Sequence, residues 1–103
     1  MATTAERLQT VREKIGAAAD AVRTDPGASP VLIAVVDEFA RKADKAVAAD
    51  DEWLAVVELE QAGDSAKYAA EADPGVSESA RQAVLDAHLD ICKTKGKLTA
   101  PAT

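Results

Sequence analysis

The sequence predicts an all-α protein that folds as an antiparallel, up-down four-helix bundle built from two helical hairpins. Alanine, the residue with the best helix propensity, is abundant, and apolar residues make up 48% of the 103 positions. The few prolines and glycines gather at a few points and divide the chain into segments of helical length, each with an apolar stripe. Short connections between such segments make consecutive helices antiparallel neighbours.

The length fits one domain, which we place at residues 1–97, followed by a short flexible tail at residues 98–103. Aromatic residues are only 3% of the chain, so alanine, valine, leucine and isoleucine must build the core. Such a core is thin, because alanine buries little area, and it requires close helix approach.

The first helix is predicted over residues 4–24. Thr3 and Glu6 have the spacing of a capping box, and Asp25-Pro26-Gly27 ends the helix. Its apolar stripe consists of Leu8, Val11, Ile15, Ala18 and Val22.

The second helix is predicted over residues 30–48, with Ser29 as N-cap and Pro30 at the first helical position. Its apolar arc consists of Val31, Leu32, Val35, Val36, Phe39, Ala43, Ala46 and Val47.

The junction at residues 48–51 contains neither glycine nor proline. Asp50 is a good N-cap for a new helix, and an aspartate inside the apolar seam of a continuous helix would be costly to bury. We therefore expect a break at Asp50. The alternative is a three-helix protein with one long central helix, because apolar residues continue in phase at 43, 47, 54 and 57; that form would expose apolar surface and oligomerise.

The third helix is predicted over residues 51–72 and the fourth over residues 78–95, with Ser77 as N-cap and Gly96 as the residue after the helix. The loop between them repeats the first one, since residues 73–77 match residues 25–29 at an offset of 48. The flanking helices align poorly, so we interpret the match as two similar solutions to one turn. The fourth helix has a main apolar stripe made of Ala80, Val84, Ala87 and Ile91.

The third helix carries the most unusual pattern. Residues 50–73 hold eight acids and one base, a net charge of −7 against −6 for the whole chain. A helical wheel gives it two apolar faces, so it is predicted to pack on both sides. One face holds Leu54, Val57, Tyr68 and Ala72; the other holds Val56, Leu59, Gly63, Ala66 and Ala70.

A third stripe on this helix is acidic and begins with the chain's one tryptophan. We name it the acidic row: Trp53, Glu60, Asp64 and Glu71. Tryptophan is enriched in protein interface hot spots, which makes this row the predicted partner-binding surface. The competing interpretation is that Trp53 folds over the end of the second helix and the acids face solvent.

Residues with metal-binding or interface chemistry lie on the fourth helix. His88 and Cys92 form an i, i+4 pair that Glu58 would complete as a metal site, although a lone histidine beside a small apolar cysteine is the usual core arrangement. Leu85, Leu89 and Cys92 form a second stripe, which is either ordinary core or an oligomer seam.

Several function classes are not expected. The sequence has no phosphate loop, GxSxG, HExxH or CxxC pattern, so we predict neither enzyme activity nor a cofactor. The acidic net charge disfavours nucleic acid as partner, and no apolar run is long enough for a membrane span. One cysteine and an N-terminus without a signal peptide favour the cytoplasm.

The sequence therefore predicts a non-catalytic interaction module whose partner is another protein: an adaptor, accessory subunit or assembly factor, with homo-oligomerisation a further possibility. One alternative is an acidic inhibitor or antitoxin-like protein that covers a basic surface. The other is a small metal- or cofactor-binding bundle. The alanine-rich composition of the chain is like that of many bacterial helical proteins.

Overall fold

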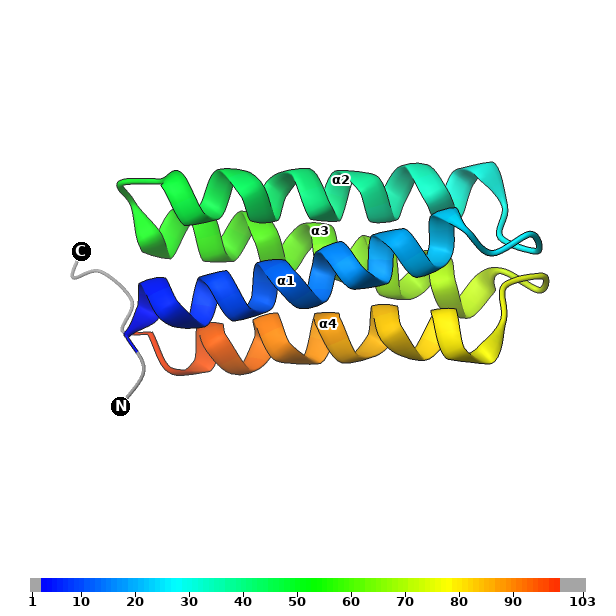
Figure 1. Cartoon of the computed structure of the whole chain (residues 1–103). Coiled ribbons are helices and arrows are strands. Elements are labelled where there is room, and N and C mark those ends of the chain that lie inside the picture. The colour runs from blue at the N-terminus through cyan, green and yellow to red at the C-terminus, as the bar shows by residue number, and fades with distance from the viewer. Residues whose placement is uncertain (1–2, 99–103) are drawn as a thin grey trace.

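Four helices lie antiparallel along a common axis (Figure 1). The computed structural model describes residues 3–98. The helices are α1 (Thr4–Arg23), α2 (Pro30–Ala48), α3 (Glu52–Ala72) and α4 (Glu78–Gly96). Each helix packs on its neighbours in the ring α1–α2–α3–α4, and α4 closes the ring against α1. The predicted up-down four-helix bundle is confirmed, and the alternative with one long continuous helix is not formed.

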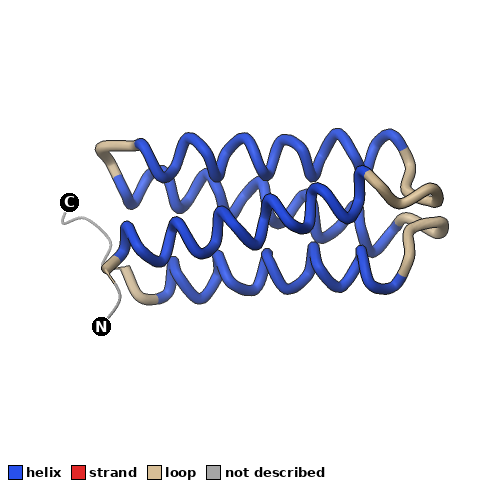
Figure 2. Tube along the Cα trace, in the orientation of Figure 1, coloured by secondary structure: helices blue, strands red, loops and turns tan. Residues whose placement is uncertain are grey.

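The ends of the bundle differ in what they hold. Figure 2 shows the α1–α2 and α3–α4 connections together at one end, and the short α2–α3 turn at the other. The start of α1 and the end of α4 lie at the same end as this turn. Of the predicted flexible tail, only Leu98 belongs to the described residues, and it packs half-buried against the core; residues 99–103 lie outside them.

Three predicted N-caps are confirmed by their hydrogen bonds. The hydroxyl of Thr3 accepts from the amide of Glu6 at 3.1 Å, which forms one half of the predicted capping box. Ser29 accepts from the Leu32 amide and Ser77 from the Ala80 amide, both at 3.2 Å. These bonds satisfy amides that the first helical turn leaves without a partner.

Three predicted boundaries are wrong by one residue. The first helix ends at Arg23, and Thr24 is its C-cap. Asp51, not Asp50, caps α3: its side chain accepts from the Leu54 amide at 3.0 Å, while Ala49 and Asp51 are extended. Gly96 is the last residue of α4 rather than the residue after it, and Lys97 caps the helix in right-handed conformation. No glycine of residues 3–98 has a positive φ, so Gly96 does not form a left-handed cap.

The core lies along one stripe of each helix, and alanine is its commonest residue. The predicted stripes of α1 and α4 are buried throughout. Phe39 of α2 is the largest fully buried side chain. Its ring lies where a side chain on Gly63 would be, since a Cβ there would come within 3.1 Å of the ring. A large residue on α2 thus fills the space that a missing side chain on α3 leaves.

The two hairpins are structurally equivalent at an offset of 48 residues. The buried positions of α2 recur in α4 without exception, and those of α1 recur in α3 apart from Ala19. The flanking helices thus correspond in their pattern of burial although their residue types align poorly, and the interpretation of the loop match as two similar solutions to one turn stays a prediction. The paired buried sets are Leu8, Val11, Ile15, Ala18 and Val22 with Val56, Leu59, Gly63, Ala66 and Ala70; and Leu32, Val36, Phe39, Ala43 and Ala46 with Ala80, Val84, Ala87, Ile91 and Thr94.

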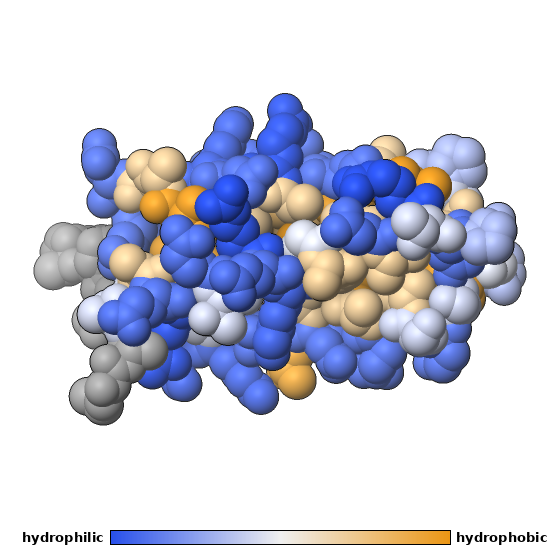
Figure 3. All heavy atoms as spheres, viewed as in Figure 1, coloured by the Kyte–Doolittle hydropathy of each residue, from blue (hydrophilic) through white to orange (hydrophobic). Residues whose placement is uncertain are grey.

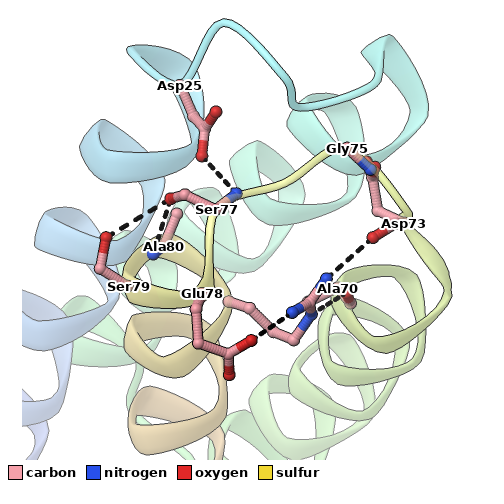
Figure 4. A network of polar contacts seen from close by, with 9 residues as sticks. Asp25, Ala70, Asp73, Gly75, Ser77, Glu78, Ser79 and Ala80 are labelled. Carbon is pink, nitrogen blue, oxygen red and sulfur yellow. Dashed lines mark hydrogen bonds and ion pairs between the residues drawn. The ribbon is translucent and has the colours of Figure 1, made fainter.

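The repeated loops hold each other through reciprocal hydrogen bonds. Asp25 accepts from the amide of Gly27 in its own loop at 2.9 Å and from the amide of Ser77 in the other loop at 2.8 Å. Asp73 does the same with Gly75 and Ser29, both at 2.9 Å. Figure 4 shows the carboxylate of Asp25 reaching across to Ser77. We name this arrangement the aspartate clasp.

The clasp depends on glycine at the point of closest approach. A Cβ on Gly27 would overlap the carbonyl oxygen of Gly75, and a Cβ on Gly75 would overlap that of Gly27. Arg81 stabilises one side further, since its guanidinium donates to the carbonyls of Ala70 and Asp73 at the end of α3. The loops therefore fix how the two hairpins meet at this end.

We predict that Phe39→Ala lowers the free energy of unfolding by about 3–5 kcal/mol, because it leaves a cavity against the backbone of Gly63. Val31→Ala is the control, since Val31 is exposed and the loss should stay below about 0.5 kcal/mol. Urea unfolding followed by circular dichroism measures both. Equal losses in the two variants would contradict this account of the core.

The clasp predicts an acid dependence of stability. Hydrogen bonds from Ser77 and Gly27 lower the pKa of Asp25, and those from Ser29 and Gly75 lower the pKa of Asp73. Between the folded pKa and the unfolded value of about 3.9, the unfolded chain binds more protons than the folded one. The contribution is therefore fully present above the unfolded pKa and is lost as pH falls through the folded pKa.

The double variant Asp25→Asn/Asp73→Asn should consequently show a flatter stability profile from about pH 5 to about pH 2 than the unchanged chain does. Unfolding free energies from urea titrations across this range measure the slope. Asp50→Asn, in the α2–α3 turn and outside the clasp, is the control. If the double variant and the unchanged chain have the same slope, the clasp does not control acid stability.

Candidate functional site

The third helix presents three stripes to three different surroundings. Its buried stripe, which includes Val56, Leu59 and Gly63, faces the core. The acidic row lies along the side that meets α4. The remaining stripe, with Leu54 and Tyr68, faces solvent. The helix packs on two neighbours, α2 and α4, as predicted, but it does so without its second apolar face, which is largely exposed at Leu54 and Tyr68.

Trp53 and Glu60 of the acidic row both meet Lys95 of α4. The Lys95 ammonium lies 6.0 Å from the centroid of the Trp53 ring and 2.8 Å from Oε1 of Glu60. The hydrogen bond to Glu60 raises the pKa of Lys95. Trp53 is half-buried, so it neither folds into the core nor stands free, and part of its ring is already used within the chain.

Asp64, the next residue of the row, meets His88. Oδ1 of Asp64 lies 2.6 Å from Nε2 of His88, and Sγ of Cys92 lies 3.6 Å from the same nitrogen. Burial raises the pKa of the Cys92 thiol, and the nearby Glu60 and Asp64 carboxylates raise it further. The surroundings of Cys92 therefore disfavour the thiolate, which is the reactive form.

The predicted metal set is not brought together. Glu58 lies on the other side of α3, where its carboxylate is 3.9 Å from Lys42 of α2. Asp64 occupies the position beside His88 that was expected for Glu58. Within residues 3–98, no three histidine, cysteine or acidic side chains have an arrangement that could hold a metal ion.

The contact of Trp53, Glu60 and Asp64 with α4 was not predicted from the sequence. His88, Cys92 and Lys95 follow 4-3 spacing, which places them on one face of α4. A basic and polar face of this kind, opposite an acidic row of the same length, was the available signal. All of these pairs lie within the C-terminal hairpin, because they join α3 to α4, which are adjacent in sequence. They therefore add to the contacts inside this hairpin.

The fourth residue of the row, Glu71, behaves differently. It is exposed, and neither Glu71 nor Glu52 forms an ion pair within the described part of the chain. The solvent-facing stripe runs alongside: Leu54 is 53% exposed and Tyr68 is 69% exposed. They are fourteen residues apart, and on a helix this separation returns nearly to the same side. We name the outward face: Leu54, Val57, Tyr68 and Ala72.

The predicted oligomer seam on α4 is divided by the structure. Leu89 is 52% exposed, whereas Leu85 and Cys92 are half-buried. Since Cys92 faces His88 and the acidic row, it belongs to the α3–α4 contact. The seam itself stays a prediction.

The surface hollows are shallow and lie away from the acidic row. One, of about 300 Å³, lies between the start of α1 and the end of α4; another, of about 260 Å³, lies between α1 and α4 and is lined mainly by alanines. Figure 3 shows this α1–α4 side as largely hydrophilic, with its broadest apolar area toward the clasp end. The first hollow is lined by charged and hydroxyl side chains, and the hydroxyls of Thr10 and Thr94 in it donate to the backbone carbonyls of Glu6 and Asp90.

No protein-family model, curated protein or solved structure matches the chain. Over residues 3–98, none of the helices has the length and apolar character needed to cross a bilayer. The case for a function therefore rests on the geometry of α3 and its neighbours.

We predict that Cys92 reacts slowly with Ellman's reagent at neutral pH, because burial and two carboxylates raise its pKa. The variant Glu60→Gln/Asp64→Asn removes both charges and should speed the reaction severalfold. Glu58→Gln/Glu71→Gln, which removes two acids elsewhere on the same helix, is the control. A double variant no faster than its control would show that the acidic row does not influence the thiol.

Proposed function

We propose that the protein is a non-catalytic interaction module that binds another protein through α3. The observation that carries the proposal is the outward face, which keeps Leu54 and Tyr68 more than half exposed although the fold has a complete core without them. Leu54 and Tyr68 are spaced along one side of the helix, as the anchors of a helix-mediated contact are, and tyrosine is enriched in hot spots. An adaptor, accessory subunit or assembly factor of the cytoplasm fits this description.

The repeat supplies an internal comparison for this face. The positions in α1 that correspond to Leu54, Val57, Tyr68 and Ala72 are all polar: Glu6, Gln9, Asp20 and Thr24. Since α1 and α3 occupy equivalent positions in the bundle, the fold does not require apolar residues there. Their presence on α3 alone supports a role outside folding.

The charge around the face indicates the kind of partner. Glu58 borders it on the α2 side, and Glu71 borders it on the α4 side, where Glu71 has no ion pair within residues 3–98. The acidic row thus forms an edge of the docking surface rather than its centre, since Trp53, Glu60 and Asp64 already contact α4. We infer a partner that presents apolar side chains flanked by lysine or arginine, as a basic amphipathic helix does.

An acidic inhibitor of a basic protein surface is the second candidate. It is favoured by the unpaired Glu52 and Glu71 on α3 and by the net charge of −6. The dependence of the association rate on ionic strength distinguishes the two candidate functions. A rate that falls steeply with ionic strength supports the inhibitor, whereas a weak dependence supports apolar docking on the outward face.

The docking proposal is tested with matched pairs of exposed residues. Leu54→Ala/Tyr68→Ala should weaken binding of a partner captured from the native source by about 30-fold or more, which corresponds to about 2 kcal/mol lost at a hot spot. Leu89→Ala/Val31→Ala is the control, because these side chains are 52% and 69% exposed on other helices. Titration calorimetry measures affinity and circular dichroism checks the fold. Equal binding by both double variants would overturn the proposal.

A further inference from the structure

The surface between the two hairpins is built so that a second copy of the chain fits it as well as the chain's own other half. The N-terminal hairpin, α1 and α2, meets the C-terminal hairpin, α3 and α4, through the clasp, the core and the ion pairs of Lys14 with Asp90 and of Lys42 with Glu58. All of these contacts join the two hairpins, and none depends on the three-residue connection between them.

That connection, Ala49 to Asp51, is short and has no residue that stops a helix. It contains neither glycine nor proline, and it is the only non-helical stretch between the start of α2 and the end of α3 in the described chain. Ala49 and Asp51 leave the helical region only by adopting extended backbone. A change in these few residues would convert α2 and α3 into one helix.

We propose that two chains exchange hairpins to form a dimer in which α2 and α3 of each chain are one continuous helix. Each N-terminal hairpin then packs on the C-terminal hairpin of the other chain. Exchange of an identical element keeps every contact of the closed form, so the two forms differ only at the hinge and in association entropy.

The core determines which hairpins pair. Phe39 of the N-terminal hairpin packs against Gly63 of the C-terminal one. At the two-fold equivalent place the repeat sets Ile15 opposite Ala87, so each large residue faces a small one. Two N-terminal hairpins together would place Phe39 against Ile15 and overpack the core, and two C-terminal hairpins would leave Ala87 against Gly63 with a cavity. Exchange between whole chains preserves the favourable pairs.

The two aspartates of the hinge, Asp50 and Asp51, disfavour the exchange of hairpins. Asp51 stabilises the closed form as the N-cap of α3. In a continuous helix Val47, Asp50 and Leu54 fall on one side, so that two long helices running antiparallel at the hinge would bring the carboxylates of Asp50 together. Removing both carboxylates should therefore favour the dimer.

The test uses the full chain with Asp50→Ala/Asp51→Ala. Since loss of an N-cap costs about 1 kcal/mol and each dimer relieves two of them, the dimer dissociation constant should fall by roughly 30-fold relative to the unchanged hinge. Sedimentation equilibrium measures it. The control inserts Gly-Gly-Ser between Ala49 and Asp50, which lets the hairpins close on themselves and should give a monomer.

Cross-linking distinguishes exchange from simple association. In a Cys92→Ala background, one chain carries Lys14→Cys and another carries Asp90→Cys, at positions whose native side-chain ends, Nζ of Lys14 and Oδ2 of Asp90, lie 3.3 Å apart across the hairpin interface. After mixing and refolding, a short bismaleimide reagent joins the two cysteines between chains in exchanged dimers, whereas chains closed on themselves hold the two thiols apart. If the hinge variant does not fold, the unchanged hinge refolded at roughly 1 mM gives the same readout.

A dimer that forms the interchain cross-link supports the proposal. Two results overturn it: a monomer at every concentration for the folded hinge variant and for the concentrated refolding, or a dimer whose mixed chains form no interchain cross-link.

Discussion

The close approach of Gly27 and Gly75 is the constraint on which the arrangement of the hairpins depends. At this point two backbones touch with no space for a side chain, and each flanking aspartate uses one carboxylate oxygen for its own loop and the other for the opposite loop. The amide of each N-cap serine is thereby tied to the other hairpin. These hydrogen bonds fix the start of α2 relative to the start of α4 independently of the core side chains. The equivalent burial of the two hairpins follows from this shared register.

Within that register an alanine-rich core must be complementary rather than bulky. Alanine loses little area on burial, so stability depends on dispersion contacts at close packing, which weaken quickly when helices separate. Phe39 against Gly63 shows how the demand is met: the size of one residue is matched by the absence of another. Equivalent buried positions of the two hairpins hold different residue types. The repeat is therefore clear in the pattern of burial and faint in residue identity.

Local chemistry was enough to predict the four helices, three of the caps and both proline-glycine loops, because these depend on residues close in sequence. Two neighbours, Asp50 and Asp51, have the same capping chemistry; the sequence analysis chose Asp50, whereas Asp51 is the cap in the structure. The helical wheel separated the stripes of α3 correctly but did not show which apolar face would pack. The face with larger residues, Leu54 and Tyr68, stays outside, because Gly63 and Ala66 let the neighbouring helices approach more closely. The pairing of the acidic row with α4 required the register of two helices, which no single-helix pattern contains.

The positions at which the two hairpins differ show which features their shared fold does not require. Where Glu60 and Cys92 lie across α3 and α4, the equivalent positions in α1 and α2 carry Arg12 and Asp44, an exposed ion pair at 2.8 Å. An ordinary surface pair therefore satisfies the fold at this place, and the half-buried contacts that Trp53 and Asp64 of the acidic row make with α4 go beyond it. This row and the apolar outward face border the same helix, and both are missing from α1. Two departures from an equivalent helix, on adjoining stripes of α3, are not required by the fold that the hairpins share, and this supports the proposed docking surface.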